Sequence, residues 1–126
     1  MMITIEKISN FNEDSLQLIQ APMTELTKDT GPIKFLDMDK LRKDMTVYPD
    51  NLIQLVVKSD NKVAGIVTLQ ESFAFYADGK YGIINELYVL PGFRSKGMGR
   101  LLLDEVKKTG RAKGWHPIDV TAPPGQ

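Results

Sequence analysis

The spacing of apolar positions changes along the chain, and each change marks a predicted element. Isoleucines alternate with polar residues over residues 3–8, which predicts a first strand. Two segments follow in which apolar residues recur every three or four positions, and these predict two helices. The first helix is expected to begin after Asn12, and the second near Asp37. Pro22 is expected to kink or end the first helix, because proline lacks the N–H that continues it.

The middle of the chain is rich in β-branched residues, which favour strands. Two such runs within residues 52–75 flank Asp60 and Asn61, residue types that tolerate the positive φ of a tight hairpin turn. Further elements are expected as a strand at residues 81–90, a helix from Gly97 to about Lys113 and a strand at residues 115–122.

The predicted order is therefore β-α-α-β-β-β-α-β, an α/β class with a mixed sheet that is mostly antiparallel. One parallel crossover is required, between the strand at residues 83–90 and the strand at residues 118–121. A chain of 126 residues suffices for one domain with a real core, so residues 1–126 are expected to form a single domain.

Composition narrows the classes of function. Sixteen basic and sixteen acidic residues cancel, so no overall field draws the chain to nucleic acid or to a membrane, and an anion site must be local. There is no cysteine and one histidine, His116, which excludes a disulfide framework, a cysteine nucleophile and a multi-histidine metal site within one chain. No apolar run approaches 18 residues, and a cytoplasmic location is expected.

A local anion site is indicated by "GFRSKGMGRLLLDEV", residues 92–106. The predicted strand ends just before this stretch, and its loop leads directly into a helix, whose first N–H groups are unpaired and carry the positive end of the helix dipole. Gly97 and Gly99 let backbone amides approach an anion closely. Three cations add positive charge here: Arg94, Lys96 and Arg100.

Two known phosphate-binding motifs fit this spacing poorly. Gly92 and Gly97 have the separation of a P-loop, but Met98 and Gly99 follow where lysine and serine or threonine are needed for the terminal phosphates and magnesium. A dinucleotide fingerprint needs a third glycine where Leu102 stands, and a parallel sheet where an antiparallel meander is predicted. The non-functional alternative is that the glycines only permit a turn between strand and helix, and that the cations are simply solvated.

The remaining motif is R-x-x-G-x-G, formed by Arg94, Gly97 and Gly99 within "ELYVLPGFRSKGMGRLLL". This stretch resembles the acetyl-CoA pyrophosphate loop of the GNAT superfamily of N-acetyltransferases. The predicted order of elements is also similar to that fold, from its start through its fifth strand. The resemblance therefore extends over essentially the whole chain.

The resemblance implies an enzyme that transfers the acetyl group of acetyl-CoA to an amine of a small molecule or peptide. The pantetheine arm would pair with the backbone of Leu87 and Val89 like an added strand, and an N–H near Val89 would polarise the thioester carbonyl. The implied pyrophosphate loop comprises Arg94, Ser95, Lys96, Gly97, Met98, Gly99 and Arg100.

Glu86 is the candidate catalytic base, because an amine must lose a proton before it can attack. It is the only acidic residue on the predicted strand, and alternation is expected to place it on one face with Ile84 and Tyr88. A purely structural carboxylate is the alternative, and the residues alone do not choose between the two roles.

A functional role is less expected for His116 and for the aromatic residues. His116 is expected at a loop or strand edge rather than as a base. Most aromatic residues that could line a substrate site are expected to pack in the core: Phe35, Tyr48, Phe73, Phe75 and Tyr76.

The end of the chain departs from the family pattern. The sequence stops just after the fifth predicted strand, so the domain is expected to lack the usual C-terminal helix and strands. An uncovered strand edge would then favour a homodimer. The missing part commonly supplies a tyrosine that protonates the leaving thiolate. A truncated acyl-CoA-binding module with weak or no catalytic activity is therefore the second hypothesis.

Overall fold

The computed structural model describes residues 2–9, 12–29, 36–47, 51–115 and 118–120. It confirms the predicted α/β class and order of elements. The elements are β1 (Ile3–Ile8), α1 (Glu13–Asp29), α2 (Met38–Met45), β2 (Leu52–Ser59), β3 (Lys62–Ala74), β4 (Gly79–Val89), the 3-10 turn η1 (Pro91–Phe93), α3 (Met98–Lys113) and β5 (Ile118–Val120).

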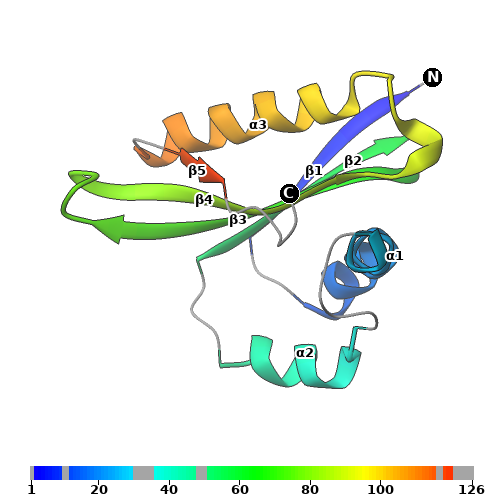
Figure 1. Cartoon of the computed structure of the whole chain (residues 1–126), viewed down its shortest axis with the longest axis horizontal. Helices are drawn as coiled ribbons and strands as arrows, with labels where there is room; N and C mark the ends of the chain where they lie inside the picture. Colours follow the sequence, from blue (N-terminus) through cyan, green and yellow to red (C-terminus); the bar gives the residue numbers. More distant parts are fainter. Residues whose placement is uncertain (1, 10–11, 30–35, 48–50, 116–117, 121–126) are drawn as a thin grey trace.

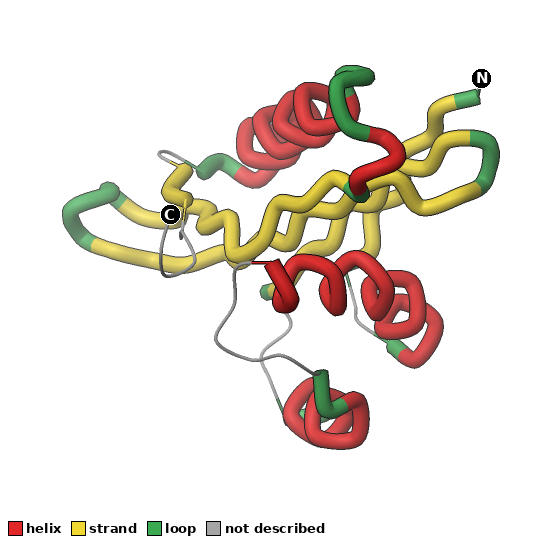
Figure 2. The backbone as a smooth tube through the Cα atoms, turned by 45° about the vertical axis from the view of Figure 1, so that its right-hand side comes forward, coloured by secondary structure: helices red, strands yellow, loops and turns green. Residues whose placement is uncertain are grey.

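The five strands form one sheet in the order β1-β2-β3-β4-β5. The first four are antiparallel to their neighbours, and β5 runs parallel to β4, with Gly82 opposite Ile118. This confirms the single parallel crossover. Helix α3 covers one face of the sheet, α1 lies against the other, and α2 lies farther from the sheet on the side of α1 (Figures 1 and 2).

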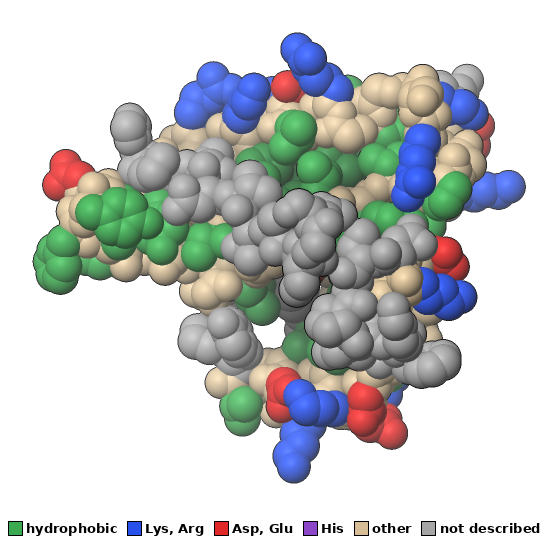
Figure 3. Space-filling view, in the orientation of Figure 1, with side chains coloured by type: hydrophobic (Ala, Val, Ile, Leu, Met, Phe, Trp, Pro, Cys, Tyr) green, Lys and Arg blue, Asp and Glu red, His purple; other side chains and the backbone are tan. Residues whose placement is uncertain are grey.

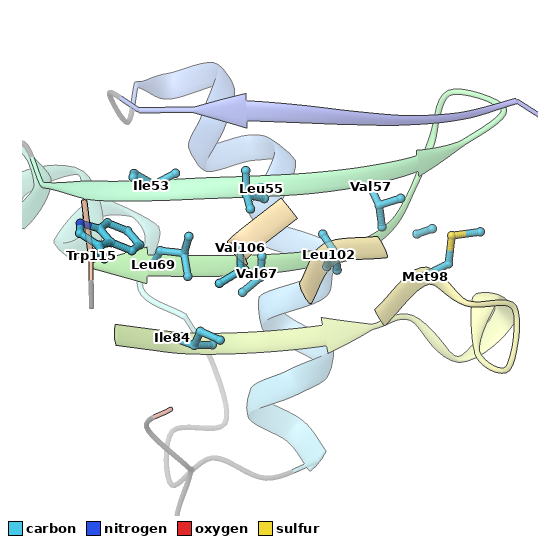
Figure 4. Close-up of a cluster of buried hydrophobic side chains, with 11 residues drawn as sticks. Ile53, Leu55, Val57, Val67, Leu69, Ile84, Met98, Leu102, Val106 and Trp115 are labelled. Atoms are coloured by element: carbon cyan, nitrogen blue, oxygen red, sulfur yellow. The ribbon is translucent and has the colours of Figure 1, made fainter. Parts of the chain in front are cut away.

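The face covered by α3 holds the larger core (Figure 4). Met98, Leu102 and Val106 follow one another at four-residue intervals on α3, and each is at most 2% exposed. Trp115 closes the end of this core against β4. A Cβ at Gly82 would lie 2.3 Å from the Trp115 ring, so glycine is required for this close approach.

Helix α1 begins with reciprocal hydrogen bonds between Asn12 and Ser15. Ser15 N donates to Asn12 Oδ1 at 3.0 Å, and Asn12 N donates to Ser15 Oγ at 2.7 Å. Two backbone N–H groups at the helix start thereby gain hydrogen-bond acceptors. The prediction that Pro22 kinks or ends the helix is wrong in its second part, since α1 continues to Asp29. Met23 and Leu26 beyond the proline are buried against the sheet, and this packing offsets the missing N–H.

The structure confirms the predicted hairpin turn between β2 and β3 but contradicts the expected burial of three aromatic residues. Asp60 and Asn61 have φ values of 50° and 67°, which confirms the predicted hairpin turn. The expectation of core packing is wrong for three aromatic residues, which lie at the projecting end of the β3–β4 hairpin (Figures 1 and 3). The sheet face that would bury them has no covering helix there. These residues are Phe73, Phe75 and Tyr76. Phe35, Tyr48 and His116 lie outside the described residues.

Candidate functional site

The loop between β4 and α3 places unpaired N–H groups at an exposed surface. Gly97 caps the helix in the left-handed region with φ 82°, and the first intrahelical hydrogen bond runs from Leu101 N to Gly97 O at 3.1 Å. The N–H groups of residues 98–100 therefore have no intrahelical acceptor. An ideal Cβ at Gly97 would meet no atom within 4 Å, so the space beside this helix end is open.

A second residue of the loop also has a left-handed backbone. Ser95 has φ 64°, which is uncommon for a residue with a side chain and costs about 1–2 kcal/mol. Left-handed residues within a turn can direct neighbouring N–H groups into a concave surface that suits an anion. Lys96 and Arg100 are exposed on either side of Gly97 and add positive charge. The loop therefore has the shape and the charge to hold a phosphate group.

Arg94 is directed toward the end of β4. Its Nε donates to Val89 O at 2.9 Å, and its guanidinium carbon lies 5.2 Å from the centre of the Tyr88 ring. The hydrogen bond and the cation–π contact fix the loop to the strand. In this conformation, the arginine of the motif shapes the anion site by holding the loop.

Met98 and Gly99 contribute to the site through their backbone. The Met98 side chain is 2% exposed and belongs to the core, so only its N–H can reach a ligand. A Cβ at Gly99 would lie 3.8 Å from Val89 Cγ2, which shows how closely the first turn of α3 approaches the end of β4. The helix N-terminus and the strand end therefore form one continuous surface.

The outer edge of β4 is open beside this loop. Leu90 N donates to Ala64 O of β3 at 2.9 Å, so alternation turns the polar backbone groups of Leu87 and Val89 away from β3. Strand β5 pairs with β4 over Gly82 to Ile84. Within the described part of the chain, no strand pairs with the outer edge at residues 85–89. A ligand can add to this edge in the manner of a strand.

A β-bulge overturns part of the expected alternation on β4. Thr68 pairs with Glu86, and Leu69 pairs with Ile84, so Asn85 is an extra residue with no counterpart on β3. Ile84 consequently packs in the core under α3, whereas Tyr88 packs in the cluster under α1. The prediction that both share a face with Glu86 is wrong for Ile84, because strict alternation fails at a bulge.

Glu86 is half-buried and is held by Thr68. The Glu86 N–H donates to Thr68 Oγ1 at 3.1 Å, and the Thr68 hydroxyl donates to Glu86 Oε1. No described residue donates to the second carboxylate oxygen, Oε2. One oxygen is thus fixed and the other remains able to accept a proton. This arrangement is compatible with a base.

A family model for acetyltransferases (GNAT) matches residues 16–124 of the sequence. The chain belongs to the GNAT family. It is a GNAT-type N-acetyltransferase, and the family generally uses acetyl-CoA. The loop, the open edge of β4 and Glu86 all lie within the matched residues. None of the curated proteins searched matches the sequence.

Solved acetyltransferase structures share this GNAT fold. The aminoglycoside acetyltransferase meta-AAC0020, from an uncultured soil metagenomic sample and in complex with sisomicin, is 19% identical, with a TM-score of 0.75 over 97% of this chain and 78% of its own. The ribosomal-protein-alanine N-acetyltransferase of Brucella melitensis biovar Abortus 2308 is 14% identical, with a TM-score of 0.77 over 98% and 82%. A predicted acetyltransferase with acetyl-CoA from Clostridium acetobutylicum is 17% identical, with a TM-score of 0.75 over 98% and 82%.

On the side of the sheet opposite α3, an ion pair connects α2 to α1. This contact was not predicted from the sequence. Arg42 of α2 reaches both carboxylate oxygens of Glu13 in α1 at 2.7 and 2.8 Å, and also Asp39 at 2.9 Å. The hydrogen bond from Arg42 lowers the pKa of Glu13 below its ordinary value. Glu13 and Arg42 are 29 positions apart, so no local pattern indicates that they meet.

Two hollows adjoin α1. A cavity of about 220 Å³ lies between α1 and α2, and its wall includes Glu13 and Arg42. A wider groove of about 580 Å³ runs between α1 and the start of the loop that joins β4 to α3. The residues that line the groove are Gln17, Gln20, Ala21, Thr24, Glu25, Leu90 and Pro91. Among the described residues that line the groove, Glu25 alone is charged.

The described residues contain no group of three His, Cys, Asp or Glu side chains positioned to hold a metal ion. Within the described ranges, no helix combines the length and the apolar character needed to cross a membrane.

Proposed function

We propose that the protein transfers the acetyl group of acetyl-CoA to an amine of a small molecule or a peptide. The observation that carries this proposal is that two backbone surfaces with unpaired polar groups lie next to each other. The unpaired N–H groups at the start of α3 suit a pyrophosphate. The open edge of β4 suits the amide groups of a pantetheine arm through both backbone groups of Leu87 and the N–H of Val89, since Val89 O accepts from Arg94. One extended ligand with both chemical features can occupy both surfaces.

Acetyl-CoA supplies an acetyl group already activated as a thioester. The loop residues 94–100 bind and orient the pyrophosphate, with Arg94 holding the loop on the strand. The outward N–H of Val89 can donate to the thioester oxygen, on which negative charge grows as the amine attacks. The open space at Gly97 suits this ligand, because an added Cβ there would meet no atom within 4 Å and a phosphate therefore has room to approach the N–H groups.

In this proposal, Glu86 takes the proton of the amine. An ammonium has no free lone pair, so its N–H bond must break before nitrogen can attack the carbonyl carbon. The proton passes to Glu86 Oε2, directly or through a water molecule. As the amine nitrogen bonds to the carbonyl carbon, the C–S bond of the thioester breaks, and CoA leaves as a thiolate that takes a proton from solvent. We expect Glu86→Gln to lower kcat by roughly 100-fold or more and to change the pH–rate profile. An unchanged profile would remove Glu86 as the base.

The proposed acceptor class stays broad for a physical reason. The named neighbours include one aminoglycoside enzyme and one ribosomal-protein enzyme on the same fold, and a shared fold does not select a substrate. The described lining of the groove beside α1 includes the neutral polar side chains of Gln17 and Gln20 and one carboxylate, that of Glu25. Such a lining favours an amine over an anionic acceptor.

The function can be tested in two stages. Calorimetric titration should show acetyl-CoA binding, and CoA release should then be followed with sisomicin, a polyamine and a peptide with an N-terminal alanine. Binding with release on one amine supports the enzyme. Binding without release on any amine favours the second hypothesis, an acyl-CoA-binding module. No binding overturns both.

We also propose that the chain forms a homodimer. The aromatic residues at the end of the β3–β4 hairpin are unusually exposed for their size, at 64% for Phe73, 93% for Phe75 and 77% for Tyr76. A second copy that covers them would remove apolar surface from water. Sedimentation at micromolar concentration should give the mass of a dimer, and a monomer would contradict the proposal.

A further inference from the structure

Thr68 of β3 makes two hydrogen bonds to one residue, Glu86 of β4. We propose that Thr68 is the positioning residue for the catalytic carboxylate of Glu86. The β-bulge at Asn85 lies directly next to this Thr68–Glu86 pair. The inference rests on the proposed function, in which Glu86 accepts the proton of the amine. Thr68 itself touches neither the amine nor the thioester in this proposal.

The geometry ties the side chain of Glu86 to its own backbone. The Glu86 N–H donates to Thr68 Oγ1 at 3.1 Å, and Thr68 Oγ1 donates to Glu86 Oε1. A hydroxyl has one proton and two lone pairs, so it can accept from the N–H while its proton goes to the carboxylate. The carboxylate therefore has a defined direction relative to β4, which leaves Oε2 for the proton.

The surroundings of Thr68 keep its hydroxyl in this position. Thr68 is 7% exposed, and Ile66 on the same face of β3 is fully buried. Solvent therefore competes little for the hydroxyl proton, and a hydrogen bond in such surroundings is stronger than one in water. An exposed threonine would exchange this bond freely with water and would hold the carboxylate poorly.

A third polar side chain extends the row across the sheet. Gln54 of β2 lies directly opposite Thr68 in the strand register, is fully buried, and its Nε2 donates to Ser15 O of α1 at 3.4 Å. Three buried or half-buried polar residues thus occupy neighbouring positions on three strands, in the order Gln54, Thr68, Glu86. Buried polar groups in the middle of an apolar sheet are costly unless they hydrogen-bond, so a functional reason for the row is expected.

The test separates positioning from general damage. Thr68→Val keeps the shape of the side chain and removes the hydroxyl, and we expect kcat to fall roughly 10- to 100-fold while the acetyl-CoA Kd and the amine KM stay within about twofold. Thr68→Ser keeps the hydroxyl and should restore most of kcat. Thr27→Val is the matched control, because the Thr27 hydroxyl donates to Thr24 O within α1, and it should leave kcat unchanged.

A double-mutant cycle gives a readout that a merely structural role would not produce. If Thr68 acts through the carboxylate, adding Thr68→Val to Glu86→Gln should cause no further loss of kcat beyond about twofold. Losses that multiply would overturn the positioning role. Thr68→Val with the wild-type kcat, beside an impaired Glu86→Gln, would overturn the positioning role alone. Glu86→Gln with the wild-type kcat would overturn the proposed base as well.

Amide hydrogen exchange tests the same geometry without turnover. The Glu86 amide proton should be protected in the wild type and in Thr68→Ser. In Thr68→Val it should exchange faster by roughly tenfold or more, because its acceptor has been removed. Equal protection in the wild type and in Thr68→Val would overturn the assignment even if Thr68→Val were too unstable to assay.

Discussion

The two faces of the sheet are stabilised in different ways. Among the described residues, eleven buried ones form one apolar cluster under α3, and Met98 joins this cluster to the loop between β4 and α3 (Figure 4). The cluster under α1 has five buried members among the described residues, the polar row lies beside it, and α2 contributes no buried residue. The half under α3 therefore depends on dense packing and backbone conformation. The half under α1 depends on a smaller apolar cluster with a row of hydrogen-bonded polar side chains beside it.

This difference agrees with what each half is proposed to do. A cofactor that is the same in every turnover needs one rigid site, which close packing provides. An acceptor site can change its lining on a fixed scaffold without loss of the fold. Mutations in the first half should therefore cost stability and cofactor affinity, whereas mutations in the second should change little beyond the acceptor side.

The largest expected effect is on the core under α3. Leu102 is fully buried, and Leu102→Ala should lower the free energy of unfolding by about 3–5 kcal/mol. Leu26 on α1 is 9% exposed and borders a smaller cluster, so Leu26→Ala should cost nearer about 2 kcal/mol. Urea unfolding of both variants measures the difference. Equal losses would show that the two faces do not differ in packing.

The next effect concerns the loop. Gly97→Val places a branched side chain at φ 82°, with an expected stability cost of about 1–2 kcal/mol. It also fills the space assigned to the phosphate, so acetyl-CoA affinity should fall by roughly tenfold or more.

Gly92→Ala is the matched control in the same loop. An added Cβ at Gly92 meets nothing within 4 Å, and Gly92 is not among the glycines with positive φ, so this variant should bind acetyl-CoA as the wild type does. Calorimetry measures both. Unchanged affinity in Gly97→Val would make the loop assignment wrong.

A smaller effect is expected where β4 meets Trp115. Trp115 Nε1 donates to Glu71 Oε1 at 2.8 Å, and Trp115→Phe removes this bond while keeping an aromatic ring near Gly82. The loss should be about 1–2 kcal/mol, as for a hydrogen bond to a charged group. Glu71→Gln keeps an acceptor oxygen and should cost less. A larger loss in Glu71→Gln would show that charge, rather than the hydrogen bond, matters there.

The smallest effect is expected between α1 and α2. Arg42→Met removes an exposed ion pair and should leave the global unfolding midpoint unchanged at neutral pH. The pKa of Glu13 is lowered by its hydrogen bond with Arg42, so the contact is fully formed above the ordinary value of 4.5 and is lost as the pH falls through the lowered value.

Chemical shifts of α2 should record this local change. In the wild type they should change on acidification below pH 4.5. In Arg42→Met they should already resemble the acid state at neutral pH. Arg42→Lys, which retains one cation, should fall between the two. Identical shifts in all three proteins at neutral pH would show that this ion pair does not hold α2.

The order of elements and the position of the loop between β4 and α3 were predictable because their signals are local. The caps at Asn12 and Asp37, the turn at Asp60 and the glycine at position 97 each act within a few residues of themselves. A helix has unpaired N–H groups in its first turn whatever surrounds it, so the position of the predicted helix start fixes where these groups lie. The R-x-x-G-x-G spacing is equally local, and it led to the family.

The remaining features were decided only by tertiary structure, because they depend on contacts between distant segments. The bulge at Asn85 moves Ile84 to the other face, and it exists only through the register of β3 against β4. The Thr68–Glu86 pair depends on the same register. Helix α1 passes through Pro22 because packing on the sheet outweighs one lost hydrogen bond. The sequence alone determined which cofactor site to look for, and packing between strands and helices determined how Glu86 is held beside it.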